Sequence, residues 1–175
     1  MKENKKYQMC TKCVMDNSYV EIDFDENGVC SSCHLYEKFR KRTALTNENA
    51  ELEFNVTIRN LKKAGEGKEY YCIAGISGDV DSSFLLHLLK QQGLRVLAVQ
   101  FDNGWNSELA VKNIENLCTK LNIDLYTYVV NWDEFRDIQL SFFKASVANI
   151  EAPTDHGVYG ALYSTARRHG IKNII

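Results

Sequence analysis

The chain has 175 residues, of which 45% are hydrophobic and 25% charged, and a formal net charge of −2. This length suits one domain of ordinary size with a small appendage, and the proportions are those of a globular protein. A pI of about 6.1 argues against nucleic acid as a partner, because nucleic-acid-binding surfaces are usually basic. No secretion signal follows Met1 and no apolar run approaches the roughly 20 residues that cross a bilayer, so we expect a cytoplasmic protein with no membrane partner.

Two cysteine pairs stand near the start of the chain. Cys10 and Cys13 form the first C-x2-C pair, and Cys30 and Cys33 form the second after an interval of sixteen residues. This spacing is typical of zinc ribbons, in which four thiolates close a tetrahedral shell around one ion. We therefore predict a structural Zn²⁺ site. Two disulfides and an iron–sulfur cluster are the alternatives that four cysteines also allow.

The residues around these pairs predict a hairpin that holds them together. Residues 23–29 alternate and contain Asn27-Gly28, the commonest dipeptide of tight hairpin turns. His34 follows the second pair directly, and we interpret it as a neighbour of the site because four sulfur atoms already fill the shell.

Polar, helix-forming residues lie between the cysteine pairs and the next apolar run. The basic residues within 38–42 are typical of a solvated helix face, and residues 43–49 have the composition of a linker. The spacing of Phe54, Ile58 and Leu61 predicts a helix of roughly ten residues. We accordingly divide the chain into a four-cysteine segment (1–42), a linker and helix (43–68) and a nucleotide-binding domain (69–175).

A Ser-Gly turn joins a predicted buried strand, residues 71–74, to a predicted helix that contains residues 84–89. Backbone N–H groups at such a turn lack intrahelical partners and can converge on an anion, and the helix dipole adds partial positive charge. Residues 77–83 do not match the P-loop or the dinucleotide-binding Gly-x-Gly-x-x-Gly motif. They resemble the PP-loop, Ser-Gly-Gly-x-Asp-Ser-Ser, of the ATP pyrophosphatases.

Asp79 stands where that motif has its second glycine. We expect it to weaken nucleotide binding, because its carboxylate would lie beside phosphates and because a glycine position can require a positive φ. The competing interpretation of the whole stretch is an ordinary helix-capping turn with Ser77 or Asp81 as the cap.

Two further strands, at 95–101 and 124–130, flank a helix that Ser107-Glu108 opens. Five apolar side chains of this helix are expected to face inward: Leu109, Val111, Ile114, Leu117 and Leu121. The alternation of strands and helices indicates right-handed crossovers and a parallel sheet. Ligands of such sheets bind outside the carboxyl ends of the strands, so Phe101 and Asp102 are candidates for contact with adenosine. For Asp102, an ordinary turn residue is the alternative.

The rest of the chain predicts a helix through 132–148, a loop at 151–157 and a helix at 158–169. Asp155 and His156 in this loop are candidates for contact with the substrate or the ATP phosphates. Thr154 or Asp155 as a simple helix cap is the alternative. Residues 171–175 have the pattern of a fourth strand with no covering helix, which predicts a sheet that is incomplete at this end.

Cys72 and Cys118 fall in the first strand and in the helix before the third strand. A free cysteine in such an apolar stretch behaves as a small hydrophobic residue. We interpret both as core residues rather than nucleophiles.

Together the cysteine pairs, the PP-loop, residues 102–106 and residues 152–157 resemble the N-acetyl sugar amidotransferase family of PP-loop ATP pyrophosphatases. The resemblance runs from Cys10 to the last residue, and because family members continue well beyond this point, the chain resembles their amino-terminal half. It implies a doubly wound α/β fold of the adenine nucleotide alpha-hydrolase-like kind with a zinc-ribbon-like segment. It also implies a cytoplasmic enzyme of bacterial surface-polysaccharide, lipopolysaccharide or nonulosonic acid synthesis.

The chemistry that the resemblance implies is conversion of an acetamido group on a sugar or sugar nucleotide to an acetamidino group. The reaction would use ATP, Mg²⁺ and ammonia from a glutaminase partner, through an adenylated intermediate. The resemblance assigns Asp81 to the loop or Mg²⁺ and four residues to pyrophosphate contacts: Ser77, Gly78, Ser82 and Ser83. The alternatives are a tRNA-thiolating PP-loop enzyme and a non-catalytic remnant that acts as a binding module.

Overall fold

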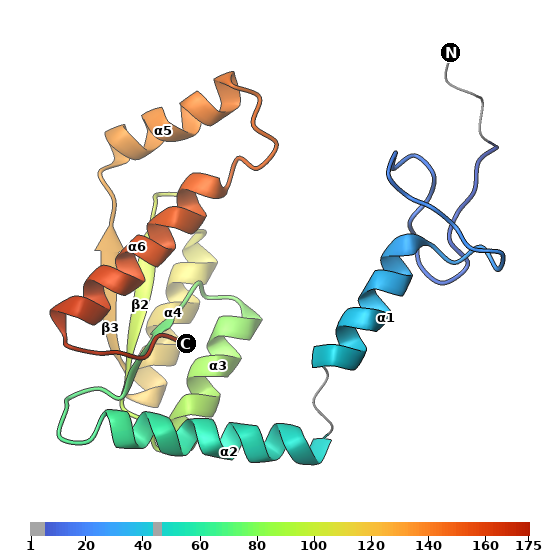
Figure 1. Cartoon of the computed structure of the whole chain (residues 1–175). Coiled ribbons are helices and arrows are strands. Elements are labelled where there is room, and N and C mark those ends of the chain that lie inside the picture. Colours follow the sequence, from blue (N-terminus) through green and yellow to red (C-terminus); the bar gives the residue numbers. More distant parts are fainter. Residues whose placement is uncertain (1–5, 44–46) are drawn as a thin grey trace. The chain divides into compact units, whose positions relative to one another are not determined.

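The computed structural model of the protein describes residues 6–43 and 47–175 (Figure 1). The chain divides into two compact units, Met1–Glu53 and Phe54–Ile175, and each is described by itself. Within the described ranges, no helix has both the length and the apolar character needed to cross a membrane.

The first unit is organised around the cysteine pairs. Two isolated antiparallel bridges, Met9–Asp16 and Phe24–Cys30, close its loops, and α1 (Ser31–Thr43) follows. A hairpin turn is present at the predicted place, but the bond from the Gly28 N–H to the Asp25 carbonyl at 2.9 Å makes Glu26 and Asn27 its central residues, and Gly28 follows with a φ of 75°. The unit thus has a small cysteine-lined core in place of an extended sheet.

α2 (Asn47–Ala64) is longer than the sequence suggested. Its 18 residues include 47–49, which we had assigned to the linker, while linker residues 44–46 lie outside the described residues. Ile58 and Leu61 are buried, as their helical spacing predicts. The helical pattern of its apolar residues therefore identified the helix but not its beginning.

The second unit is a parallel sheet of order β1-β2-β3 with helices on both faces. The strands are β1 (Cys72–Gly75), β2 (Val96–Asp102) and β3 (Asp124–Val129). The helices that follow them are α3 (Val80–Gln91), α4 (Glu108–Leu121), α5 (Trp132–Lys144) and α6 (Ala152–Arg168). The predicted doubly wound α/β fold is confirmed, and the described sheet is short.

Alternate residues of the central strand face opposite layers. Val96 and Ala98 pack with α2, α3 and α4, whereas Leu97 and Val99 pack with α6. Figure 1 shows α6 lying across one face of the sheet. Because both faces are covered, β2 is an almost continuous apolar run, as is usual for a parallel strand.

Several element boundaries differ from the sequence-based expectations. α4 turns Ile114 and Cys118 into the core but leaves Leu109 and Val111 exposed, so two of its five predicted inward residues are wrong. α5 ends at Lys144 rather than continuing to 148. The expected fourth strand, residues 171–175, makes a single parallel bridge from Ile174 to β1.

The expected loop at 151–157 is also wrong, because α6 begins at Ala152. Pro153 lies in the first turn, where its missing N–H costs no intrahelical hydrogen bond. Glu151 is the N-cap residue and makes no capping bond with its side chain, so neither Thr154 nor Asp155 is the cap. Asp155 and His156 are consequently helical residues.

Candidate functional site

Gly78 gives the turn between β1 and α3 its shape. Its φ of 83° lies in the left-handed region, and a Cβ at this position would overlap the carbonyl group of Ala110 on α4. The Asn113 side chain also donates to the Gly78 carbonyl at 3.2 Å. The loop is therefore packed directly against α4, and only glycine fits at this position.

Asp79 is the N-cap of α3. Its φ of −87° and ψ of 179° are ordinary for any residue, so our expectation that position 79 could require a positive φ is wrong. Its carboxylate Oδ1 accepts hydrogen bonds from the Ser82 N–H at 3.1 Å and from the Ser82 hydroxyl at 2.8 Å. Neither Ser77 nor Asp81, the two caps proposed from the sequence, fills this position.

The serine side chains of the turn form one cluster with this carboxylate. The Ser77 and Ser82 hydroxyl oxygens are 3.0 Å apart, and the Ser77 N–H donates to the Ser82 hydroxyl at 3.3 Å. Hydrogen bonds from the Ser82 side chain and N–H lower the pKa of the Asp79 carboxyl. The carboxylate thus accepts from donors that an anion at this helix end would use.

Ser83 and Asp81 complete the first turn of α3. Ser83 is half-buried and its N–H donates to the Asp79 carbonyl at 3.2 Å, while Asp81 is exposed. The structure therefore brings to one turn, together with Asp79, the four residues that were predicted for pyrophosphate contact: Ser77, Gly78, Ser82 and Ser83.

Asp102 begins the turn that follows β2. Its Oδ1 accepts from the Gly104 N–H at 3.0 Å and from the Asn106 side-chain amide at 3.4 Å. Gly104 has a φ of 82° and lies against the Trp132 ring. These bonds give Asp102 the turn-stabilising role that was its alternative interpretation, at the carboxyl end of the sheet.

Asn103, which was not among the site residues predicted from the sequence, connects this turn to α6. It is buried, with its side-chain amide donating to the Thr154 hydroxyl at 3.2 Å and its Oδ1 accepting from the Trp105 N–H at 3.1 Å. A buried asparagine must find such partners, because an unpaired amide in a core is costly. The signal available in the sequence was a polar residue directly after a buried strand.

The Phe101 side chain borders a cavity of about 690 Å³ at the carboxyl ends of β2 and β3, between α5 and α6. Its apolar walls include Phe101, Tyr128, Phe135, Ile138, Phe142 and Pro153. The Phe101 and Tyr128 rings are nearly parallel, with centroids 6.1 Å apart. This volume lies within the range of small-molecule sites.

Gly157 allows α6 to approach the Phe101 ring, because a Cβ at this position would overlap the ring. His156, the residue before Gly157, and Pro153, one turn of helix earlier along α6, line the same cavity. His156 is exposed, and its Nδ1 is 2.8 Å from the Ala152 carbonyl, to which it donates. Asp155 is exposed and does not line the cavity, so the structure separates the two residues that were predicted to act together.

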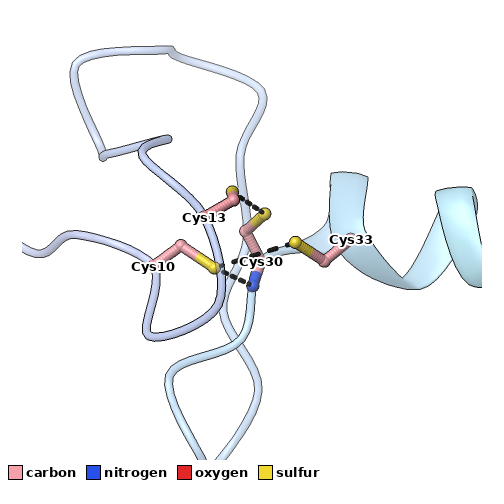
Figure 2. Close-up of side chains that lie close together, drawn as sticks. All are labelled: Cys10, Cys13, Cys30 and Cys33. Atoms are coloured by element: carbon pink, nitrogen blue, oxygen red, sulfur yellow. Dashed lines mark hydrogen bonds between the residues drawn. The ribbon is translucent and has the colours of Figure 1, made fainter.

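The four-cysteine site brings its ligands together from two loops and the first turn of α1 (Figure 2). The four Sγ atoms lie within 4.8 Å of one another, with Cys10 and Cys33 separated by 3.9 Å and Cys13 and Cys30 by 3.7 Å. A tetrahedral ion with bonds of about 2.3 Å to sulfur places its ligands about 3.8 Å apart. The cysteines therefore fit a metal ion, and their number also suits an iron–sulfur cluster.

Backbone donors support negative charge on one of these sulfurs. Burial acts to raise the pKa of Cys10, but the N–H groups of Lys12 and Cys30, each 3.3 Å from its Sγ, bring it to about 6. A thiolate is the form that binds metal. Near the site, His34 contacts the Asp25 carboxylate at 2.8 Å, as expected for a neighbour that is not a ligand.

The other two cysteines are core residues, as predicted. Cys72 on β1 and Cys118 on α4 are buried in the same apolar cluster. Burial raises the pKa of Cys72 to about 11 and also raises that of Cys118. Neither thiol is poised as a nucleophile.

No protein-family model matches the sequence. Over 118 residues, 66% of the chain, it is 30% identical to an uncharacterised protein of Methanocaldococcus jannaschii, of which it covers 40%. Over 75 residues, 42% of the chain, it is 37% identical to the tRNA(Ile)-lysidine synthase of Chlamydia pneumoniae, of which it covers 23%. The chain thus matches less than half of the length of either relative.

The fold has a counterpart among solved structures. The glutamine-dependent NAD⁺ synthetase of Acinetobacter baumannii, in complex with adenosine diphosphate, superposes with a TM-score of 0.53 and 15% identity, over 65% of this chain and 22% of that one. The chain is related to the PP-loop ATP pyrophosphatase superfamily. Residues 77–83, which resemble the PP-loop motif except at Asp79, lie at the turn from β1 to α3.

Proposed function

We propose that this protein is the ATP-binding part of an N-acetyl sugar amidotransferase. The observation that carries the proposal is the placement of the PP-loop serines and an apolar cavity at the same, carboxyl, edge of the sheet. In parallel α/β proteins, ligands bind at this edge. The PP-loop would hold the nucleotide phosphates, and the cavity would hold the acceptor.

The proposed reaction has two steps, adenylation of the acetamido oxygen and displacement of AMP by ammonia. The acetamido oxygen attacks the α-phosphorus of ATP, the bond from that phosphorus to the β-phosphate oxygen breaks, and pyrophosphate leaves. Ammonia then adds to the imidate carbon, and the carbon–oxygen bond breaks to release AMP with the former amide oxygen. After ammonia loses its extra protons, the product is an acetamidino group.

The PP-loop would hold the pyrophosphate as it leaves. The Ser77 and Ser82 hydroxyls lie 3.0 Å apart beside the start of α3, and Ser83 follows in the same turn, so these hydroxyls and the first N–H groups of the helix are the donors that would serve this role. Mg²⁺ would neutralise phosphate charge when bound, and Asp81 is the nearby exposed carboxylate suited to it.

The cavity would hold the acceptor. Its described lining contains aromatic rings, the Glu134 carboxylate and His156, but no lysine or arginine. An uncharged acetamido sugar suits such walls, since its C–H faces pack on rings and its hydroxyls donate to a carboxylate. His156 is the residue at the cavity that could accept or deliver a proton, whereas Asp155 would act from outside it.

The remaining parts of the proposal concern partners and location. Ammonia would come from a glutaminase subunit, and the acceptor would be a sugar or sugar nucleotide of bacterial surface-polysaccharide synthesis in the cytoplasm. The four cysteines would hold a structural Zn²⁺, which the sulfur separations of 3.7 Å and 3.9 Å support.

Asp79 favours a second candidate function. Because its carboxylate occupies donors of the PP-loop, the protein could instead be a non-catalytic binding module that retains the fold. Such a protein would keep its metal and its sheet but release neither AMP nor pyrophosphate.

The test measures AMP, pyrophosphate and acetamidino product from ATP, Mg²⁺, ammonium and candidate N-acetyl sugar nucleotides, with the native protein and with Asp79→Gly. Product from either form that is lost on Ser82→Ala, but kept in Ser164→Ala on α6, would support the amidotransferase. The Ser164 hydroxyl donates to its own helix at 3.0 Å, away from the loop, which makes this variant a matched control. AMP release that requires tRNA instead of sugar would replace the proposal with tRNA modification, and no release from either form would favour the binding module.

A further inference from the structure

The outer edge of β3 is open in the described part of the chain. The sheet order is β1-β2-β3, so β3 pairs only with β2. Its sequence, Asp-Leu-Tyr-Thr-Tyr-Val, contains no lysine or proline, the residues that commonly protect edge strands from pairing. Leu125 and Val129 are 37% and 68% exposed. An apolar edge without such protection is a template for another strand.

The backbone direction of β3 follows from one hydrogen bond. The Val130 N–H donates to the Asp102 carbonyl at 3.0 Å, so the even-numbered residues of this strand direct their N–H and C=O groups toward β2. The odd-numbered residues, Leu125, Thr127 and Val129, therefore direct theirs outward. The free edge consists of the donors and acceptors of these three residues.

The edge is complementary to a second copy of itself. If two β3 strands pair antiparallel about a two-fold axis at Thr127, each Thr127 faces its counterpart and Leu125 faces Val129. All outward N–H and C=O groups then find partners. On the opposite face Tyr126 lies across from Tyr128, and aromatic, apolar and Thr–Thr pairs are the stabilising kinds of cross-strand pair.

Charge does not oppose this register. Asp124, the one ionisable acid in the strand, would lie opposite the apolar Val130, and its carboxylate already accepts from the Tyr70 hydroxyl at 2.9 Å. No like charges meet across the axis. Shifting the centre by one residue to Tyr126 would leave the outward groups of Val129 unpaired within the strand, so Thr127 is the favoured centre.

We propose that β3 is the interface of a two-fold symmetric dimer, in which the sheets of two copies join edge to edge through Thr127. A pair of six-residue strands buries less area than a typical stable interface, so the dimer should dissociate in the micromolar range. The inference is independent of the proposed function, because it rests on the strand edge and not on the PP-loop.

The test measures molecular mass by light scattering and sedimentation over a range of protein concentrations. The native protein should shift from 20.0 kDa to twice this mass as concentration rises. Val129→Lys, which places a charge opposite Leu125, should raise the dissociation constant at least tenfold. Val111→Lys makes the same change at an exposed site on α4 and should leave the dissociation constant unchanged.

Hydrogen exchange tests the register. In the dimer, the amides of Leu125, Thr127 and Val129 should exchange at least tenfold more slowly than in dilute monomer. Circular dichroism serves as the control that both lysine variants are folded. A native protein that stays monomeric would overturn the proposal, as would a dimer that survives Val129→Lys. Open-ended aggregates, or protection confined to other segments, would show that a different surface associates.

Discussion

The Asp79 carboxylate accepts hydrogen bonds from both the N–H and the hydroxyl of Ser82, at 3.1 Å and 2.8 Å. One side chain therefore caps α3 and, at the same time, takes donors that a PP-loop would offer to phosphate. A bound pyrophosphate would have to displace the carboxylate or lie next to it. In either arrangement the carboxylate opposes binding, so a substitution of Asp79 should change the affinity for pyrophosphate.

Asp79→Gly should tighten binding of ATP or pyrophosphate by at least about tenfold, since it removes both a like charge and a competitor for the Ser82 donors. Asp79→Asn keeps a good helix cap but loses the charge, so it should bind with intermediate affinity. Calorimetry on the three proteins checks the order. Equal affinities would show that the carboxylate does not interfere with the anion site.

Asp79 should also make the stability of α3 depend on pH. Because hydrogen bonds from Ser82 lower its pKa in the folded protein, its contribution is complete above the unfolded pKa of about 4 and is lost as pH falls through the lower folded value. Between about pH 5 and pH 2, the melting temperature of the native protein should therefore fall more than that of Asp79→Asn. Parallel curves for the two proteins would contradict the assigned hydrogen bonds.

The purified protein should contain one Zn²⁺ per chain, bound by Cys10, Cys13, Cys30 and Cys33. Cys13→Ser should lose the metal and unfold the first thirty or so residues while the sheet remains, because the first unit has little other core. Cys118→Ser makes the same chemical change in the sheet unit and should keep its zinc. Elemental analysis that finds iron, or mass spectrometry that finds two disulfides, would refute this assignment.

Gly157→Ala should destabilise the protein by about 1–3 kcal/mol, because a Cβ at this position overlaps the Phe101 ring. Gly160→Ala, one turn away on the same helix, adds its methyl group where no other atom lies within 4 Å. It should stabilise the helix by up to about 1 kcal/mol. Thermal unfolding of both variants provides the comparison, and equal effects would show that α6 does not approach Phe101 closely.

The parts of the fold that follow from local patterns were predictable. The apolar run of β2 and the Ser107 cap of α4 are visible in the sequence and present in the structure. The exposure of Leu109 and Val111 was not predictable, because α4 contacts the core only over its later turns. Helical periodicity indicates a face but not the extent of its contact.

The site was predictable in its residues more than in its geometry. The Ser-Gly motif located the turn, but two nearby positions could carry the positive φ, and the structure assigns it to Gly78. Because Gly78 has the positive φ, Asp79 has an ordinary backbone conformation and can cap α3, so it is not strained as we had expected. The cavity beside Phe101 depends on how α5 and α6 meet the sheet, and such long-range contacts leave no local pattern.

The two tryptophans of the chain, Trp105 and Trp132, lie together at the carboxyl end of the sheet. Their ring centroids are 5.5 Å apart, and the Trp105 indole donates to Gln139 on α5 at 2.7 Å. All of the tryptophan fluorescence therefore originates beside the turn that Asp102 begins. Emission should shift when a ligand enters or α5 moves, so the protein carries its own optical reporter and needs no added label.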